Sequence, residues 1–187
     1  MNERENKEAP KPMSPDPAAP EPQLRLEAEQ AKGLAAEADP AALGIETRRI
    51  EYGSDEYRLS LALRDGVLRK PLGRSIADDD LSGDAEALLL AAFAGERLVG
   101  TLMLRTKSGN LLQMKQVAVD ESLRGINIGR KLVVYAEAEA ARQGCFEMML
   151  HAREVAVAFY EKLGYARDSE VFEEMGIPHY VMRKKLL

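Results

Sequence analysis

Residues 117–132 read VAVDESLRGINIGRKL: a β-branched run, a polar turn that contains glycine, and the start of a helical pattern. A strand that leads into a helix in this way leaves the first backbone N–H groups of the helix unpaired and directs the positive end of the helix dipole at the turn. Arg124, Arg130 and Lys131 add positive charge there. The segment therefore predicts a phosphate-binding or pyrophosphate-binding turn, although an ordinary strand-to-helix connection has the same pattern.

Strand and helix signals alternate on both sides of this junction, which is typical of a mixed α/β sheet domain. Short turn sequences at Gly95–Glu96 and 108–110 separate three consecutive strand patterns and indicate an antiparallel meander. The predicted elements, in chain order, are a strand over 48–52, a helix over 54–68, strands over 88–93, 97–105 and 111–119, a helix over 128–142, a strand over 146–150, a helix over 153–163, and strands over 165–172 and 180–184.

The signals at the ends of two of these helices are specific. Ser54 is placed to cap the helix over 54–68, and Gly73 follows its end. Gly144 is a stop signal after the helix over 128–142. One apolar face of that helix is predicted to pack against the sheet: Ile128, Leu132, Val133, Ala136 and Ala140.

The chain divides into three regions. Residues 1–22 hold six of the nine prolines and almost no large apolar side chains, so we expect a disordered tail rich in proline and glutamate. Residues 23–46 favour a helix with a thin apolar stripe, followed by a linker. Residues 47–187 form the predicted folded domain.

Composition excludes several classes of protein. Hydrophobic residues at 45% and charged residues at 30% are ordinary for a globular chain of 187 residues. The most apolar stretch, 85–95, is too short to cross a bilayer. The net charge of −5 resides entirely in residues 1–46, so the neutral remainder lacks the basic surface of a nucleic-acid binder. A single Cys145 and a charged start without a signal sequence indicate a cytoplasmic protein.

Two segments carry a resemblance to a known family. The turn after the central strand is similar to the coenzyme A motif of the GCN5-related N-acetyltransferases (GNAT), Gln/Arg-x-x-Gly-x-Gly/Ala, with Arg124 and Gly129 in place and Asn127 instead of the first glycine. Asparagine tolerates the left-handed backbone that the turn needs and can also cap a helix. Residues 156–168, AVAFYEKLGYARD, resemble the A-x-x-FYEKLGF segment of that family. The resemblance spans about residues 48–186, and the segments 53–73 and 172–184 resemble an uncharacterised subgroup.

The resemblance implies a mixed, mostly antiparallel central sheet flanked by helices, with a central strand that splays from its neighbour. It implies acetyl-CoA as co-substrate and no metal. The strand would offer backbone groups to the pantetheine arm, and one strand N–H would polarise the thioester carbonyl. The implied coenzyme A contacts are Val117, Ala118, Val119, Arg124, Gly125, Ile126, Asn127, Ile128, Gly129, Arg130 and Arg153.

Tyr160 matches the general acid of the family, which protonates the departing thiolate. Helical spacing puts Phe159, Val155 and Leu163 on one face, which we expect to be buried. Tyr160 then lies about 100° round the helix and can point into a cleft.

The sequence does not identify the general base. Relatives carry glutamate on the central strand, where this chain has Met114, Lys115 and Gln116. Attack on the thioester needs a neutral amine, so a carboxylate or histidine must accept a proton. The candidates near the end of the chain are His151, Glu173, Glu174 and His179.

The predicted function is transfer of an acetyl group from acetyl-CoA to a primary amine. The acceptor is expected to be a small molecule or a peptide, and no nucleic acid or membrane is expected as partner. The sequence does not decide whether the protein forms a homodimer. Asn127 and the missing strand glutamate suggest an alternative function: a catalytically inactive acyl-CoA-binding or regulatory module. A second alternative is an interaction protein that acts through its acidic tail.

Overall fold

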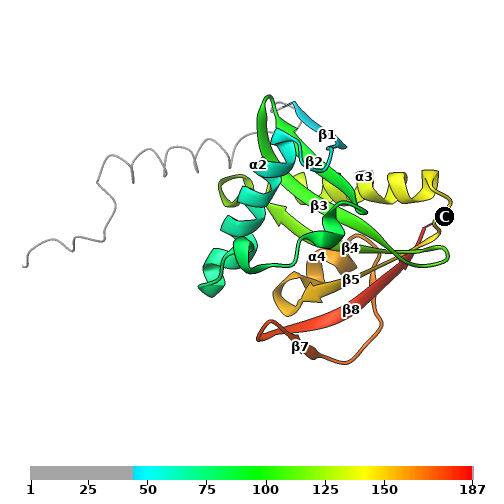
Figure 1. Cartoon of the computed structure of the whole chain (residues 1–187). Helices are drawn as coiled ribbons and strands as arrows, with labels where there is room; N and C mark the ends of the chain where they lie inside the picture. Colours follow the sequence, from blue (N-terminus) through cyan, green and yellow to red (C-terminus); the bar gives the residue numbers. More distant parts are fainter. Residues whose placement is uncertain (1–43, 187) are drawn as a thin grey trace, which may run out of the picture.

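Residues 44–186, the part of the chain that the computed structural model describes, form an eight-stranded sheet with helices on both faces (Figure 1). The strand order is β1 (Ile45–Arg49), β2 (Leu88–Ala94), β3 (Arg97–Ser108), β4 (Leu111–Val119), β5 (Glu147–Arg153), β8 (Ile177–Lys185) and β6 (Ala166–Arg167), and β7 (Phe172–Glu174) pairs with β8. Among these strands only β4 and β5 pair in parallel, so the predicted mixed, mostly antiparallel sheet is confirmed. The predicted tail over 1–22, and the predicted helix and linker up to residue 43, lie outside the described residues.

The predicted antiparallel meander forms one half of the sheet. It consists of β2 (Leu88–Ala94), β3 (Arg97–Ser108) and β4 (Leu111–Val119). The outer strand β1 covers Ile45–Arg49 rather than the predicted 48–52, because its five residues are those that pair with β2. The strand thus includes Ile45 and Glu46, which precede the predicted start of the domain at Thr47.

Strand β2 is buried on both faces, which explains its continuous apolar sequence. Leu89, Ala91 and Phe93 pack on the side of helix α2 (Asp55–Arg64). The alternate residues Leu90 and Ala92 pack on the side of helix α3 (Ile128–Arg142). The two helices therefore cover opposite faces of the sheet.

Helix α3 has the predicted boundaries and the predicted buried face. It ends before Gly144, whose φ of 75° is the left-handed conformation that suits glycine. Glu139 is also buried on this helix and accepts a hydrogen bond from Arg49 Nε at 2.7 Å. This pair ties the outer strand β1 to α3.

Helix α2 begins as predicted, since Ser54 Oγ accepts a hydrogen bond from Tyr57 N at 3.1 Å. It ends at Arg64, before Gly66, rather than at Leu68. The chain continues in a π turn, η1 (Asp65–Arg69), and a 3-10 turn, η2 (Lys70–Leu72). The 3-10 turns η3 (Ile76–Asp78) and η4 (Ser82–Asp84) lead to β2. No helix within residues 44–186 is long and apolar enough to span a bilayer.

Strand β5 covers Glu147–Arg153 and is longer than predicted, because it pairs with β8 as far as Arg153 opposite His179. The predicted helix over 153–163 was therefore placed too early and made too long. A 3-10 turn, η6 (Glu154–Ala156), is followed by the short helix α4 (Val157–Glu161).

The closing strands also differ from the prediction. One strand over 165–172 was expected, but the structure has β6 (Ala166–Arg167) and β7 (Phe172–Glu174). At the interruption, Val181 N of the neighbouring strand donates its hydrogen bond to Ser169 Oγ at 2.9 Å in place of a strand carbonyl. A tight turn at Met175–Gly176 joins β7 to β8 (Ile177–Lys185).

Candidate functional site

The parallel strands β4 and β5 separate part of the way along their length. They pair from Leu111–Met114 to Glu147–Leu150 and no further. Gln116 forms a bulge with a φ of 54°, and the register between β3 and β4 shifts at that point. Beyond Met114, the edge of β4 that faces β5 therefore has no partner strand among residues 44–186, and the predicted splay is present.

A cavity of about 600 Å³ opens where the strands separate. Its wall includes the π turn η1 after α2, the start of α3, η6, α4 and the β7–β8 hairpin. It brings together thirteen predicted site residues: Val117, Val119, Arg124, Gly125, Asn127, Ile128, Gly129, Arg130, His151, Arg153, Tyr160, Glu174 and His179. Ala118 and Ile126 are buried and do not line it, and Glu173 is exposed outside it.

The turn before α3 has the backbone that its sequence allows. Gly125 and Asn127 have φ values of 88° and 64°, so Asn127 adopts the left-handed conformation expected of it. Its side chain makes no capping hydrogen bond, and the suggested capping role is therefore wrong. The first N–H groups of α3 are left without a side-chain cap beside the cavity, together with Arg124 and Arg130.

Gly129 allows helix α4 to approach the start of α3. A Cβ atom at this position would lie 3.3 Å from the ring of Phe159, which is tighter than ordinary contact. The aromatic ring thus closes one side of the cavity against the helix terminus.

Tyr160 lines the cavity, but the face of its helix differs from the prediction. Val155 is 92% exposed and Phe159 37% exposed, whereas Tyr160 is only 6% exposed. The short helix α4 turns Tyr160 inward against Tyr165, with ring centroids 5.8 Å apart. Burial raises the pKa of the Tyr160 phenol well above its ordinary value, so the hydroxyl keeps its proton. No side chain within residues 44–186 forms a hydrogen bond with that hydroxyl.

Three of the four base candidates meet around Phe172. His151 Nδ1 lies 3.0 Å from Glu174 Oε2, and a carboxylate can only accept, so His151 donates from Nδ1. His179 donates from Nδ1 to the carbonyl oxygen of Ile177 at 2.8 Å. His179 Nε2 is 4.0 Å from Glu174 Oε2, which is too long for a hydrogen bond. When neutral, each imidazole therefore has an unprotonated Nε2.

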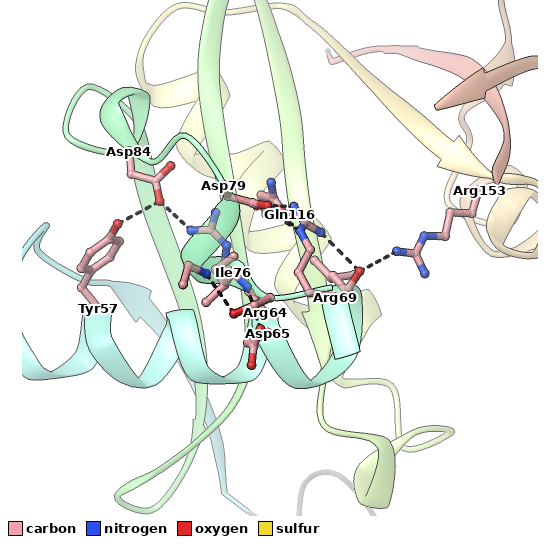
Figure 2. Close-up of polar contacts among 12 residues, drawn as sticks. Tyr57, Arg64, Asp65, Arg69, Ile76, Asp79, Asp84, Gln116 and Arg153 are labelled. Carbon is pink, nitrogen blue, oxygen red and sulfur yellow. Dashed lines mark hydrogen bonds and ion pairs between the residues drawn. The ribbon is translucent and has the colours of Figure 1, made fainter. Parts of the chain in front are cut away.

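The turns after α2 add a polar cluster that sequence reasoning missed (Figure 2). Arg69 donates from Nη2 to Asp79 Oδ2 at 2.6 Å and to Gln116 Oε1 at 3.3 Å. The carbonyl oxygen of Leu68 accepts from Arg69 Nη1 and from Arg153 Nη2, both at 3.3 Å. Arg153 thus reaches from β5 across the cavity to the turn after α2. The segment resemblance over 53–73 marked this region without indicating its role.

Positive charge dominates the cavity. Glu174 is the one carboxylate on its wall within the described residues, whereas five cations line it: Arg69, Lys115, Arg124, Arg130 and Arg153. Burial lowers the pKa of Arg153, and the nearby charges of Arg69 and Arg124 lower it further. The arrangement suits an anionic ligand. No group of three His, Cys, Asp or Glu residues suited to a metal ion occurs between residues 44 and 186.

Comparisons with known proteins give a consistent picture. A family model described as an acetyltransferase (GNAT) domain matches residues 67–186. The chain is similar to a Bacillus subtilis protein provisionally named an acetyltransferase, with 33% identity over 135 residues that cover 70% of this chain and 90% of that protein.

Solved structures share the fold. A crystal structure from Lactobacillus plantarum, provisionally named an N-acetyltransferase, matches with a TM-score of 0.70 and 23% identity and covers 76% of this chain and 99% of its own. A Bacillus subtilis acetyltransferase solved in complex with CoA matches with a TM-score of 0.59 and 22% identity, with the same coverage of 76% and 99%.

Proposed function

Because this chain belongs to the GNAT family of acetyltransferases, we propose that it transfers an acetyl group from acetyl-CoA to a primary amine by direct attack with both substrates bound. The observation that carries the proposal is the single cavity that joins the glycine-containing turn, Tyr160 and the His151–Glu174 pair. Each of these groups has a distinct task in such a reaction.

The residues at the start of α3 fit coenzyme A. Uncapped N–H groups, the helix dipole and the side chains of Arg124 and Arg130 suit its pyrophosphate. Acetyl-CoA, when bound, supplies the thioester as the acetyl donor. The unpaired edge of β4 near Val117 and Val119 can donate a backbone N–H to a carbonyl oxygen, where it stabilises developing negative charge.

Tyr160 serves as the general acid. Its phenol is protonated at neutral pH, and no side chain among residues 44–186 accepts a hydrogen bond from it, so the hydroxyl can donate to a thiolate. The face of α4 that carries Tyr160 into the cavity supports this role more directly than the spacing argument did.

His151 serves as the general base, and Glu174 positions it. Glu174 holds the proton of His151 on Nδ1, so Nε2 is free to accept a proton from the attacking amine. His179 is the weaker candidate, because its side chain is only 9% exposed and its contact with Glu174, at 4.0 Å, is too long for a hydrogen bond. The pair replaces the strand glutamate that the chain lacks.

A screen of primary amines tests the proposal. The protein is incubated with acetyl-CoA and each amine, free thiol is followed, and the acetylated product is identified by mass spectrometry. The proposal expects thiol release that requires an amine and matches product formation. Binding of acetyl-CoA without turnover on any amine would favour the inactive acyl-CoA-binding module instead.

A further inference from the structure

Lys115 and Arg153, two cations on the cavity wall, lack an acidic partner among residues 44–186. Lys115 forms no ion pair with any residue between 44 and 186. Arg153 has one hydrogen bond there, to the carbonyl oxygen of Leu68 at 3.3 Å (Figure 2). The Leu68 carbonyl is neutral and is shared with Arg69, so it leaves the charge of Arg153 uncompensated.

Arg69 and Glu174, which line the same cavity, are already paired. Arg69 forms a bidentate pair with Asp79, at 2.9 Å from Nε to Oδ1 and 2.6 Å from Nη2 to Oδ2. Glu174 is engaged by His151. The acidic groups around the cavity are therefore occupied, and they leave Lys115 and Arg153 for a ligand.

Both cations lie on the same face of the sheet as His151. Side chains alternate along a strand, and Met114, Leu150 and Ala152 belong to the core under α3. Lys115, His151 and Arg153 consequently face the α2 side. Lys115 and His151 are also the first residues beyond the last β4–β5 pair, Met114 opposite Leu150, so they flank the point of separation.

Half-buried cations without counter-ions favour an anion between them. Burial and neighbouring arginines already lower the pKa of Arg153, which reflects the unfavourable environment of its charge. An anionic group from a ligand would relieve it through charge-assisted hydrogen bonds. The same positive field disfavours a second positive charge, so it also favours the neutral form of an incoming amine.

We propose that the acceptor is an amine that also carries a carboxylate or phosphate group, and that Lys115 and Arg153 bind this anion while the amine faces His151. The inference rests on the proposed acetyl transfer and deepens it by naming the class of acceptor. It assigns Arg153 to the acceptor rather than to coenzyme A.

Matched pairs of amines test the assignment. Tyramine is compared with tyrosine, and ethanolamine with phosphoethanolamine, by kcat/KM with saturating acetyl-CoA. The anionic member should be favoured roughly tenfold to a hundredfold, the range expected for a hydrogen bond to a charged group. A preference for tyrosine assigns a carboxylate, and a preference for phosphoethanolamine assigns a phosphate.

The two amines of a pair differ in basicity as well as in charge. Variants remove this effect, because the kcat/KM of each amine is compared between the parent protein and the variant. Lys115→Met should abolish most of the preference, and Lys115→Glu should reverse it. Lys107→Met is the matched control, since Lys107 is exposed on β3 and outside the cavity. It should keep the preference of the parent protein.

Calorimetric binding of the same amines to the protein saturated with CoA separates this inference from the proposed function. If no amine is acetylated but anionic members still bind more tightly in a manner that requires Lys115, acetyl transfer fails and the anion site stands. Equal affinity and equal kcat/KM within both pairs, or a preference that survives Lys115→Met, would overturn the anion site.

Discussion

His151 and Glu174 meet in the cavity although their strands are not neighbours in the sheet: Nδ1 of the histidine lies 3.0 Å from Oε2 of the glutamate. Strand β8 lies between β5 and β7 and brings the two side chains together. The β7–β8 hairpin therefore completes the site that β5 begins.

Glu174→Gln should lower kcat/KM by about tenfold to a hundredfold, because the amide no longer holds His151 as a charged acceptor does. His151→Ala should lower it by roughly 10²- to 10⁴-fold, the usual contribution of a general base. Glu173→Gln is the control, since that carboxylate is exposed and outside the cavity. Equal activity of the Glu173 and Glu174 variants would refute the pairing.

Gly129→Val should weaken acetyl-CoA binding, because a Cβ at this position already lies 3.3 Å from Phe159 and a larger side chain displaces the ring into the cavity. Gly66→Ala is the control, because a Cβ there meets nothing within 4 Å and φ is not left-handed. Titration calorimetry measures both dissociation constants. An unchanged constant for Gly129→Val would show that the approach of α4 does not shape the binding site.

Asp84→Asn should destabilise the fold by about 3–5 kcal/mol, the cost of leaving a buried charge without its partner. Asp84 accepts from Arg64 at 2.6 Å and from the Tyr57 hydroxyl at 3.0 Å, and both ionic side chains are almost fully buried (Figure 2). Asp55→Asn removes an exposed pair with Arg58 and should change little. Urea unfolding distinguishes them, and similar midpoints for the two variants would contradict the assignment.

Stability should fall above about pH 10, where phenols in the unfolded chain ionise. Burial and the hydrogen bond to Asp84 raise the pKa of Tyr57 to about 12, and burial also raises the pKa of Tyr160 and Tyr165. The folded state holds these protons more tightly, so their contribution is complete below pH 10 and declines as pH rises towards 12. Thermal unfolding midpoints between pH 8 and 12 measure this loss of stability, and Tyr57→Phe should make the loss smaller. A midpoint that stays constant over that range would rule the effect out.

Those parts of the site that depend on residue type and spacing within a short segment could be predicted from the sequence. The left-handed Asn127 and the buried face of α3 follow from residue type and spacing within one turn and one helix. The meander follows from its turn residues. Local rules suffice for these features, because the interactions that fix them are only a few residues apart in the chain.

The rest depends on contacts between distant segments. Pairing with β8 extends β5 and shortens the helix that follows, and this turned Tyr160 inward where spacing had suggested Phe159. The Ser169 hydrogen bond splits the expected strand and leaves β7 to carry Glu174 to His151. The sequence does not indicate a binding role for Arg69 or Lys115, because that role depends on which charges surround them in the fold.

Turnover by Tyr160→Phe tests the central claim most directly, with the best acceptor from the amine screen. The variant keeps the ring and removes the acidic proton, so kcat and kcat/KM should fall together by roughly 10²- to 10⁴-fold. The dissociation constant for acetyl-CoA should stay near that of the parent protein. Because the pKa of Tyr160 is raised, the parent protein should show no alkaline loss of rate from this group below about pH 10. Near-normal turnover in a folded Tyr160→Phe protein would show that another group protonates the thiolate, and would contradict the account.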